Sequence, residues 1–100
     1  MIQHVVAFRL SAEDFEGKNR QTKLAQAELK KLDSGQIPGL LDLQVRADLG
    51  RDGTHWDLIL VSHHESESAL AEYMAHPVHV EVAREVAVHV AQKAIIDSVV

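Results

Sequence analysis

Two segments of this chain alternate as β-strands do, and each carries apolar side chains on both of its faces. These segments span residues 2–10 and 55–64. One face holds His4, Val6, Phe8, Trp56, Leu58 and Leu60, and the other holds Val5, Ala7, Ile59 and Val61. Successive side chains of a strand point in opposite directions, so a sheet that contains both segments needs a cover on each side.

The segments between these strands predict a helix and a further strand. Leu24, Ala25, Leu29 and Leu32 form a stripe at helical spacing, and Gly35 ends it. Ser11 can cap this helix, whose start lies between residues 11 and 21. Residues 41–49 then alternate between apolar and polar, as in a strand with one face exposed to solvent, and Leu43 lies on the apolar side.

The C-terminal half predicts two helices and a last strand. Ser66 is a good N-cap for a short helix that must end before Pro77, and Pro77 can open the next helix at its first position. Residues 78–92 fit both the two-residue alternation of a strand and the spacing of a helix face. We assign them to this helix because the run is long for a strand. Residues 94–100 form a β-branched final strand.

The predicted order is β-α-β-β-α-α-β, an α+β fold of the ferredoxin-like split βαβ type in one domain spanning residues 1–100. Its antiparallel four-stranded sheet has helices on one face. The first and third strands, which are apolar on both faces, lie in the middle of such a sheet. The uncovered face would leave an apolar patch in water, so we expect a homodimer that packs through this open sheet face.

Composition narrows the classes of partner. Ten Lys and Arg against fifteen Asp and Glu give a net charge of −5, with no basic cluster, so neither nucleic acid nor a membrane surface is an expected partner. The chain has no Cys, which excludes disulfides and thiolate chemistry, and its start lacks the features of a signal peptide. We expect a cytoplasmic protein in which the seven His are the main side chains that can titrate near neutral pH.

Three stretches resemble the stress-responsive A/B barrel (Dabb) family: residues 2–8, residues 37–39 and, most specifically, residues 73–80 with their His-Pro-x-His element. The resemblance runs nearly from end to end and implies a dimer whose two sheets form a barrel. It also implies a similarity to the family's plant polyketide cyclase, which closes a ring by an aldol step without metal or organic cofactor. On that resemblance, Tyr73 and His79 are the candidate catalytic residues and His4 is a pocket residue.

The residue types suit proton transfer. An imidazole can remove a proton alpha to a carbonyl, and a phenol beside it can stabilise the resulting oxyanion. The alternative is that His79 is a core histidine bonded to the Tyr73 hydroxyl or to a backbone carbonyl. The expected substrate-binding residues on the helix side of the sheet are His4, Val6, Phe8, Leu43, Trp56, Leu58, Leu60 and His76.

The other histidines argue against a metal site. His76 and His79 lie three residues apart, but Pro77 disturbs the spacing and no third ligand is evident. His76 can instead cap the helix that Pro77 opens. His63 and His64 are neighbours on a strand and point to opposite faces. We therefore expect no metal and no cofactor.

Three functions remain open at this stage. The first is a cofactor-independent, cyclase-like enzyme acting on a small apolar carbonyl compound, with His79 as base and Tyr73 as its partner. The second is a non-catalytic dimer that binds a small apolar ligand or confers stress tolerance. The third is a cofactor-free monooxygenase, because other dimeric α/β-barrel families perform such chemistry.

Overall fold

The computed structural model describes residues 1–50 and 53–100. The sequence also predicts a tight turn at residues 50–53, of which Arg51 and Asp52 lie outside the described residues. The elements follow the predicted order. They are β1 (Ile2–Leu10), α1 (Phe15–Lys30), β2 (Leu40–Ala47), β3 (Leu58–His64), α2 (Glu67–Ala75), α3 (Pro77–Ala87) and β4 (Val90–Val99). The fold is therefore the expected ferredoxin-like α+β arrangement.

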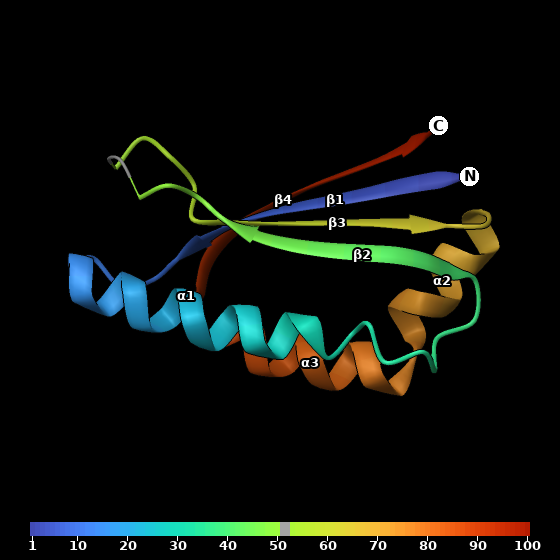
Figure 1. Ribbon diagram of the computed structural model, residues 1–100, viewed down its shortest axis with the longest axis horizontal. Helices are drawn as coiled ribbons and strands as arrows, with labels where there is room; N and C mark the ends of the chain where they lie inside the picture. Colours follow the sequence, from blue (N-terminus) through green and yellow to red (C-terminus); the bar gives the residue numbers. More distant parts are fainter. Residues whose placement is uncertain (51–52) are drawn as a thin grey trace.

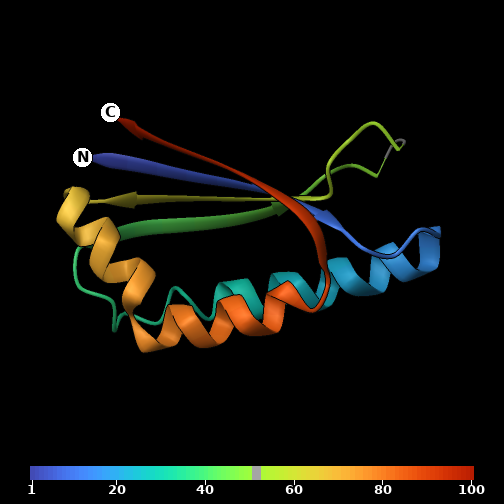
Figure 2. The ribbon, with the colours of Figure 1, turned by 180° about the vertical axis from the view of Figure 1, so that it is seen from behind.

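The four strands form one antiparallel sheet in the order β2-β3-β1-β4. As expected, β1 and β3 occupy its centre. All three helices lie on the same side of the sheet, with α1 and α3 running alongside each other beneath it (Figure 1, Figure 2). The opposite side carries no helix, and the two termini lie at the same end of neighbouring strands β1 and β4.

Side-chain hydrogen bonds move two of the predicted boundaries, one through a local contact and one through contacts between distant residues. Asp14, not Ser11, caps α1, because its carboxylate accepts a 2.9 Å hydrogen bond from the Gly17 backbone N–H. The β3 strand starts at Leu58 instead of residue 55. The reason lies in Asp57, whose carboxylate accepts from the Leu10 backbone N–H at 2.8 Å and from Lys18 Nζ at 2.9 Å, so it ties the preceding loop to β1 and α1.

The end of α3 and the start of β4 differ from the prediction. The helix was expected to reach residue 92 and the strand to begin at 94, whereas α3 ends at Ala87 and β4 begins at Val90. Val90 pairs with Leu10 and Gln92 with Arg9, with a register shift between these two pairs. Pairing along the whole of β1 gives these residues backbone hydrogen bonds that outweigh their helical pattern.

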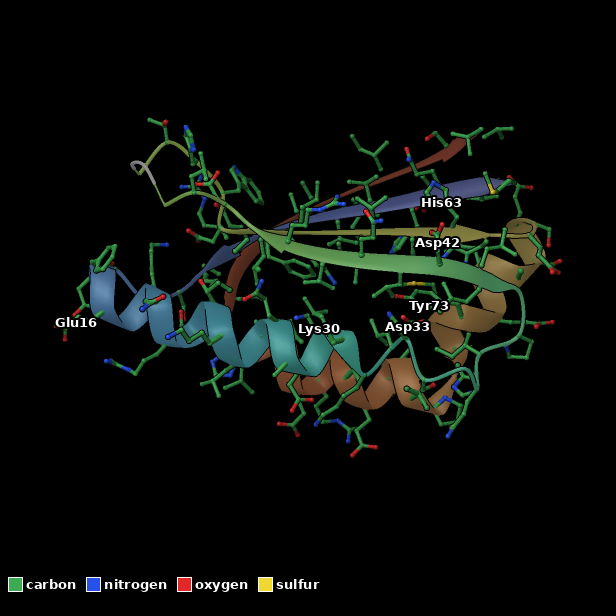
Figure 3. All side chains as sticks on the ribbon, in the orientation of Figure 1. Glu16, Lys30, Asp33, Asp42, His63 and Tyr73 are labelled. Carbon is green, nitrogen blue, oxygen red and sulfur yellow. The ribbon has the colours of Figure 1, made fainter. Side chains whose placement is uncertain are left out.

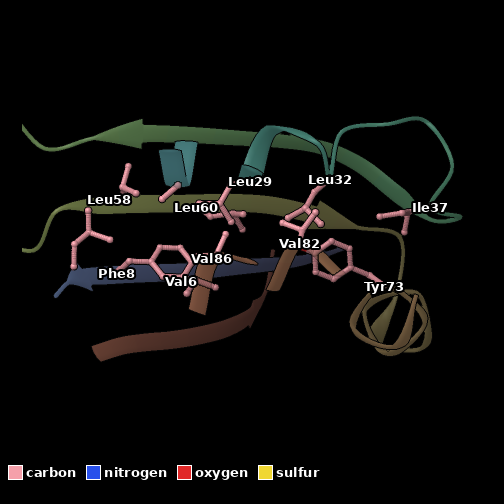
Figure 4. Close-up of a cluster of buried hydrophobic side chains, with 12 residues drawn as sticks. Val6, Phe8, Leu29, Leu32, Ile37, Leu58, Leu60, Tyr73, Val82 and Val86 are labelled. Atoms are coloured by element: carbon pink, nitrogen blue, oxygen red, sulfur yellow. The ribbon is translucent and has the colours of Figure 1, made fainter. Parts of the chain in front are cut away.

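The core lies between the sheet and the helices, where Val6, Phe8, Leu58 and Leu60 of the central strands meet apolar residues of α1, α2 and α3 (Figure 4). The other side of the sheet is also apolar. We call this surface the open-face patch; it comprises Val5, Ala7, Ile59, Val61, Ala94 and Ile96, which form two cross-strand rows. Ile96 is 67% exposed and Ile59 is 38% exposed in the isolated chain.

Gly39 holds the turn that leads into β2 against the start of α2. Its φ is +78°, a conformation that L-residues with a side chain rarely adopt, and its carbonyl accepts from the Glu65 backbone N–H at 2.9 Å. A Cβ at Gly39 would lie 2.5 Å from the Ala69 Cβ. Gly35 has nearly the same φ, +77°, but open space around it.

We predict that Gly39→Ala destabilises the protein more than Gly35→Ala does. Gly35→Ala should cost about 1 kcal/mol, from backbone strain alone. Gly39→Ala adds overpacking against Ala69 and should cost about 2–4 kcal/mol. Denaturant unfolding of the two variants measures the difference, and equal losses would show that the contact with Ala69 is not tight.

Candidate functional site

A cavity of about 280 Å³ opens between α3 and the helix-facing side of β1 and β4. Most of its wall is apolar. Val6 and Phe8 come from β1, Leu60 from β3 and Val82 and Val86 from α3. The polar side chains His4, Tyr73 and His79 also line it. The edge strand β4 leaves one side of the cavity open, since Ile95, which lines it, is 45% exposed.

The break between α2 and α3 brings Tyr73 and His79 together. His76 has an extended backbone, and its Nδ1 accepts a hydrogen bond from the Val78 N–H at 3.1 Å, so it caps α3 as Pro77 opens it. The chain turns here, and the last residues of α2 face the first residues of α3. The Tyr73 and His79 rings lie 4.7 Å apart between centroids, at an interplanar angle of 53°.

The hydrogen bond of His79 defines which ring nitrogen carries its proton. His79 Nδ1 lies 3.1 Å from the Met74 carbonyl oxygen, which belongs to the last turn of α2. A carbonyl can only accept, so Nδ1 donates and Nε2 of the neutral ring keeps a free lone pair. Burial lowers the pKa of His79 below 6.5; the Met74 hydrogen bond opposes this shift, while His4 and Lys93 add to it. The ring is thus a neutral base at neutral pH.

Tyr73 is suited to donate a hydrogen bond. Its side chain is 1% exposed, and burial raises the pKa of its phenol well above the usual 10, so the hydroxyl keeps its proton. Within residues 1–50 and 53–100, no hydrogen bond occupies this hydroxyl. The Tyr73 hydroxyl can therefore donate a hydrogen bond to a ligand in the cavity.

His4 is oriented by a carboxylate from the neighbouring strand. His4 Nδ1 lies 2.5 Å from Asp97 Oδ1, and the two residues face each other across the β1–β4 ladder. The carboxylate accepts, so Nδ1 donates and the far nitrogen of the neutral ring is an acceptor. The His4 ring is 3% exposed and lies 5.8 Å from the Tyr73 ring.

A second buried histidine lies behind Tyr73. His64 is fully buried, its ring is 4.6 Å from that of Tyr73, and its Nε2 lies 2.9 Å from the Ser62 hydroxyl. Its Nδ1 has no hydrogen-bond partner among the described residues. Burial lowers the pKa of His64, and a proton on His4 would lower it further, so the His64 ring is neutral at pH 7.

Comparison with known proteins assigns the family. The family model described as Stress Responsive A/B Barrel Domain (Dabb) matches residues 2–100. The chain belongs to the Dabb family. No curated protein sequence gives a significant match to this Dabb chain.

Solved structures share the fold of this Dabb chain over nearly its whole length. A dimeric ferredoxin-like protein of unknown function from Thermobifida fusca has a TM-score of 0.83 at 24% identity and covers 99% of this chain and 90% of its own. A Dabb protein from Mesorhizobium loti has a TM-score of 0.74 at 22% identity, covering 99% and 95%. The hydroxynitrile lyase of Passiflora edulis has a TM-score of 0.69 at 14% identity, covering 99% and 92%.

The cavity of the Dabb chain gathers some of the residues predicted from the sequence and not others. Its lining includes His4, Val6, Phe8, Leu60, Tyr73 and His79. The remaining predicted residues lie elsewhere. Leu58 is in the core, Leu43 packs against the core, Trp56 lies in the loop under Arg9, and His76 caps α3. A strand side faces a cavity only over part of its length, which alternation cannot reveal.

Asp97 and His64 were not predicted as site residues. The signal for His64 was its place in the alternation of β3, two positions beyond Ser62 and on the side of Leu60. Asp97 is the one acidic residue in the β-branched final segment, but its pairing with His4 depends on the strand register. Adjacent His63 points the other way, as predicted, and binds Asp42 at 2.6 Å on the open face, opposite Tyr73 (Figure 3).

Neither the histidines nor the acidic residues gather into a metal site in the part of the chain that the structure describes. No group of three or more His, Cys, Asp or Glu side chains there could hold an ion. His76 uses its Nδ1 for the α3 cap, and His79 uses its own for Met74. None of the described helices is both long and apolar enough to cross a bilayer.

We predict that the stability of this Dabb protein falls as the pH drops below 6.5. The folded-state pKa values of His64 and His79 are lowered, so the unfolded chain binds more protons and the free energy of unfolding decreases with falling pH. His64→Leu should reduce this dependence between pH 7.5 and 5.5, because it removes one of the two groups.

Urea unfolding at the two pH values measures this effect. His55→Gln is the matched control, since His55 is exposed and lies outside the cavity. A wild-type protein that is equally stable at both pH values would contradict the prediction. So would a His64→Leu variant with the wild-type dependence.

Proposed function

We propose that this protein is a homodimeric, cofactor-independent enzyme that removes a proton alpha to a carbonyl of a small apolar compound and promotes cyclase-like ring closure. The observation that carries the proposal is the state of His79. Its Nδ1 is committed to Met74, which leaves Nε2 as the basic nitrogen, and its ring lines an apolar cavity beside the protonated Tyr73 hydroxyl. This combination supplies a base and an oxyanion donor in one space.

The proposed reaction has two steps. In the first, His79 Nε2 takes the proton from the carbon alpha to the substrate carbonyl, and the Tyr73 hydroxyl donates a hydrogen bond to the carbonyl oxygen as it becomes negative. In the second, the enolate carbon attacks another carbonyl carbon of the same molecule, and the protonated His79 returns its proton to the new alkoxide. A carbon–carbon bond forms, and no electrons are exchanged with another reagent.

His4 supports this chemistry as a polar group at the same end of the cavity. Asp97 holds its Nδ1, so the ring has a defined orientation and its other nitrogen can accept a hydrogen bond from the substrate. This carboxylate–imidazole pair resembles those that orient histidines in other enzymes. We assign His4 to substrate orientation and Asp97 to positioning of His4.

The relatives are consistent with an enzyme and with a dimer. One solved protein of this fold is named hydroxynitrile lyase, so the fold can carry out a reaction on a small molecule. The Thermobifida fusca relative is described as dimeric. In this chain the open-face patch supplies a surface for such a dimer, because it is apolar, contiguous and free of helices.

We predict that the wild-type protein catalyses α-proton exchange of 4-phenylbutan-2-one in D₂O, followed by proton NMR. His79→Ala should lower the rate by about 100-fold or more, and Tyr73→Phe by about 10- to 100-fold. The rate should rise with pH with a midpoint below 6.5, because the neutral form of His79 is the base and its pKa is lowered. His89→Ala, which lies outside the cavity lining, is the matched control.

Thermal unfolding of each variant separates catalysis from structure. A catalytic His79 predicts loss of exchange with a stable fold. A non-catalytic ligand-binding dimer predicts no exchange in the wild type, and a structural His79 predicts loss of stability without a selective loss of exchange. Either of the last two results would end the enzymatic proposal.

We also predict that Val61→Asp splits or unfolds the dimer. Val61 lies at the centre of the open-face patch, between Val5 and Gln44 of the neighbouring strands, and a two-fold interface there would bury two like charges. Ala71→Asp, on the exposed surface of α2, should leave the dimer intact. Sedimentation at micromolar concentration tests both variants, and a monomeric wild type or a dimeric Val61→Asp protein would contradict the prediction.

A further inference from the structure

The charge of the cavity is opposite to that of the protein. The chain carries a net charge of −5, with fifteen acidic residues. Yet none of these residues lines the cavity in the part of the chain that the structure describes, and the lining includes one ammonium group, that of Lys93. The wall is otherwise apolar apart from Gln92 and the cluster of His4, Tyr73 and His79.

The strand register places Lys93 on the cavity side of β4. Lys93 pairs with Phe8, whose ring is buried beneath the helices, and Ile95 and Asp97 follow on the same side of the strand. The charge of Lys93 also contributes to the lowered pKa of His79, so its ammonium is close enough for its field to be felt there. Lys93 thus faces the same space as the proposed base.

Lys93 has no counter-ion within the described chain. No hydrogen bond or ion pair joins it to residues 1–50 or 53–100. The nearest acidic residue on its side of β4 is Asp97, four positions along, which is roughly 13 Å at the rise of a strand. That carboxylate already binds His4.

We infer that the ligand of this cavity carries a carboxylate that pairs with Lys93, joined by an apolar body to a carbonyl that lies at the His79 and Tyr73 end. This assignment deepens the proposed function and rests on it for the role of the carbonyl. The unpaired cation provides recognition of the anion, and the apolar wall between β1 and α3 holds the body. Lys93 is then a specificity-determining residue.

The competing explanation is that Lys93 only protects an edge strand. A lysine on an edge discourages pairing with other chains, and an inward-pointing charge serves that purpose too. Such a role predicts no discrimination between charged and neutral ligands. Binding of a matched pair of probes therefore separates the two explanations.

The probes are 4-(4-acetylphenyl)butanoate and its primary amide, which share the ketone and the apolar body that separates the two ends, and differ in charge. Calorimetric titration of the full chain at low salt should show the acid binding about five-fold more tightly than the amide, the size expected of an ion pair to an exposed lysine such as Lys93. The preference should shrink in 0.5 M NaCl. Lys93→Met should abolish the preference without weakening amide binding, and Lys93→Arg should retain it.

Lys23→Met, on the exposed surface of α1, is the matched control and should keep the wild-type preference. Equal binding of acid and amide, a preference that survives Lys93→Met, or binding of neither probe would overturn the inference. Exchange of the α-protons of the same two probes tests the proposed function separately. If only the proposed catalysis fails, the acid still binds more tightly than the amide but neither probe exchanges its α-protons. If only the Lys93 inference fails, both probes exchange their α-protons and the protein does not distinguish the acid from the amide.

Discussion

The pairing of β1 with β4 is the interaction on which the site depends. This ladder draws residues 90–92 out of the helical pattern and forms one wall of the cavity. It sets Asp97 against His4 and Lys93 against Phe8. A slip of one residue would turn both charged side chains to the open face, because strand side chains alternate. The register of one edge strand thus decides the chemistry that the cavity can offer.

The second constraint is the burial of polar rings in the core. His4, His64 and Tyr73 are all at least 97% buried, and such groups are costly unless their hydrogen bonds are made. His4 binds Asp97 and His64 binds Ser62, while His64 Nδ1 is buried without a partner among the described residues. Unsatisfied buried groups of this kind gather at functional sites, where stability is given up for reactivity.

Much of the fold could be predicted because its signals are local. Period-two alternation marked β1, β2 and β3, and the Ser66 cap and Pro77 marked the limits of α2 and the start of α3. The central place of the two strands with apolar faces on both sides followed from the topology. The cap of α1 was mispredicted although it is local, because Asp14 and not Ser11 accepts the hydrogen bond at the helix start. The other predictions failed where a tertiary contact decided the outcome, as at the start of β3 at Leu58 and the end of α3.

The sequence by itself determined the order of elements, because alternation, caps and prolines are local signals, and its family resemblance singled out Tyr73 and His79 as candidates. Only the tertiary structure decided which residues of each strand face the cavity, and so it left out Leu43, Trp56, Leu58 and His76. It alone joined Asp97 to His4 and brought Lys93 to the same cavity. Those contacts depend on strand register and helix position, which arise from hydrogen bonds and packing between residues far apart in the chain.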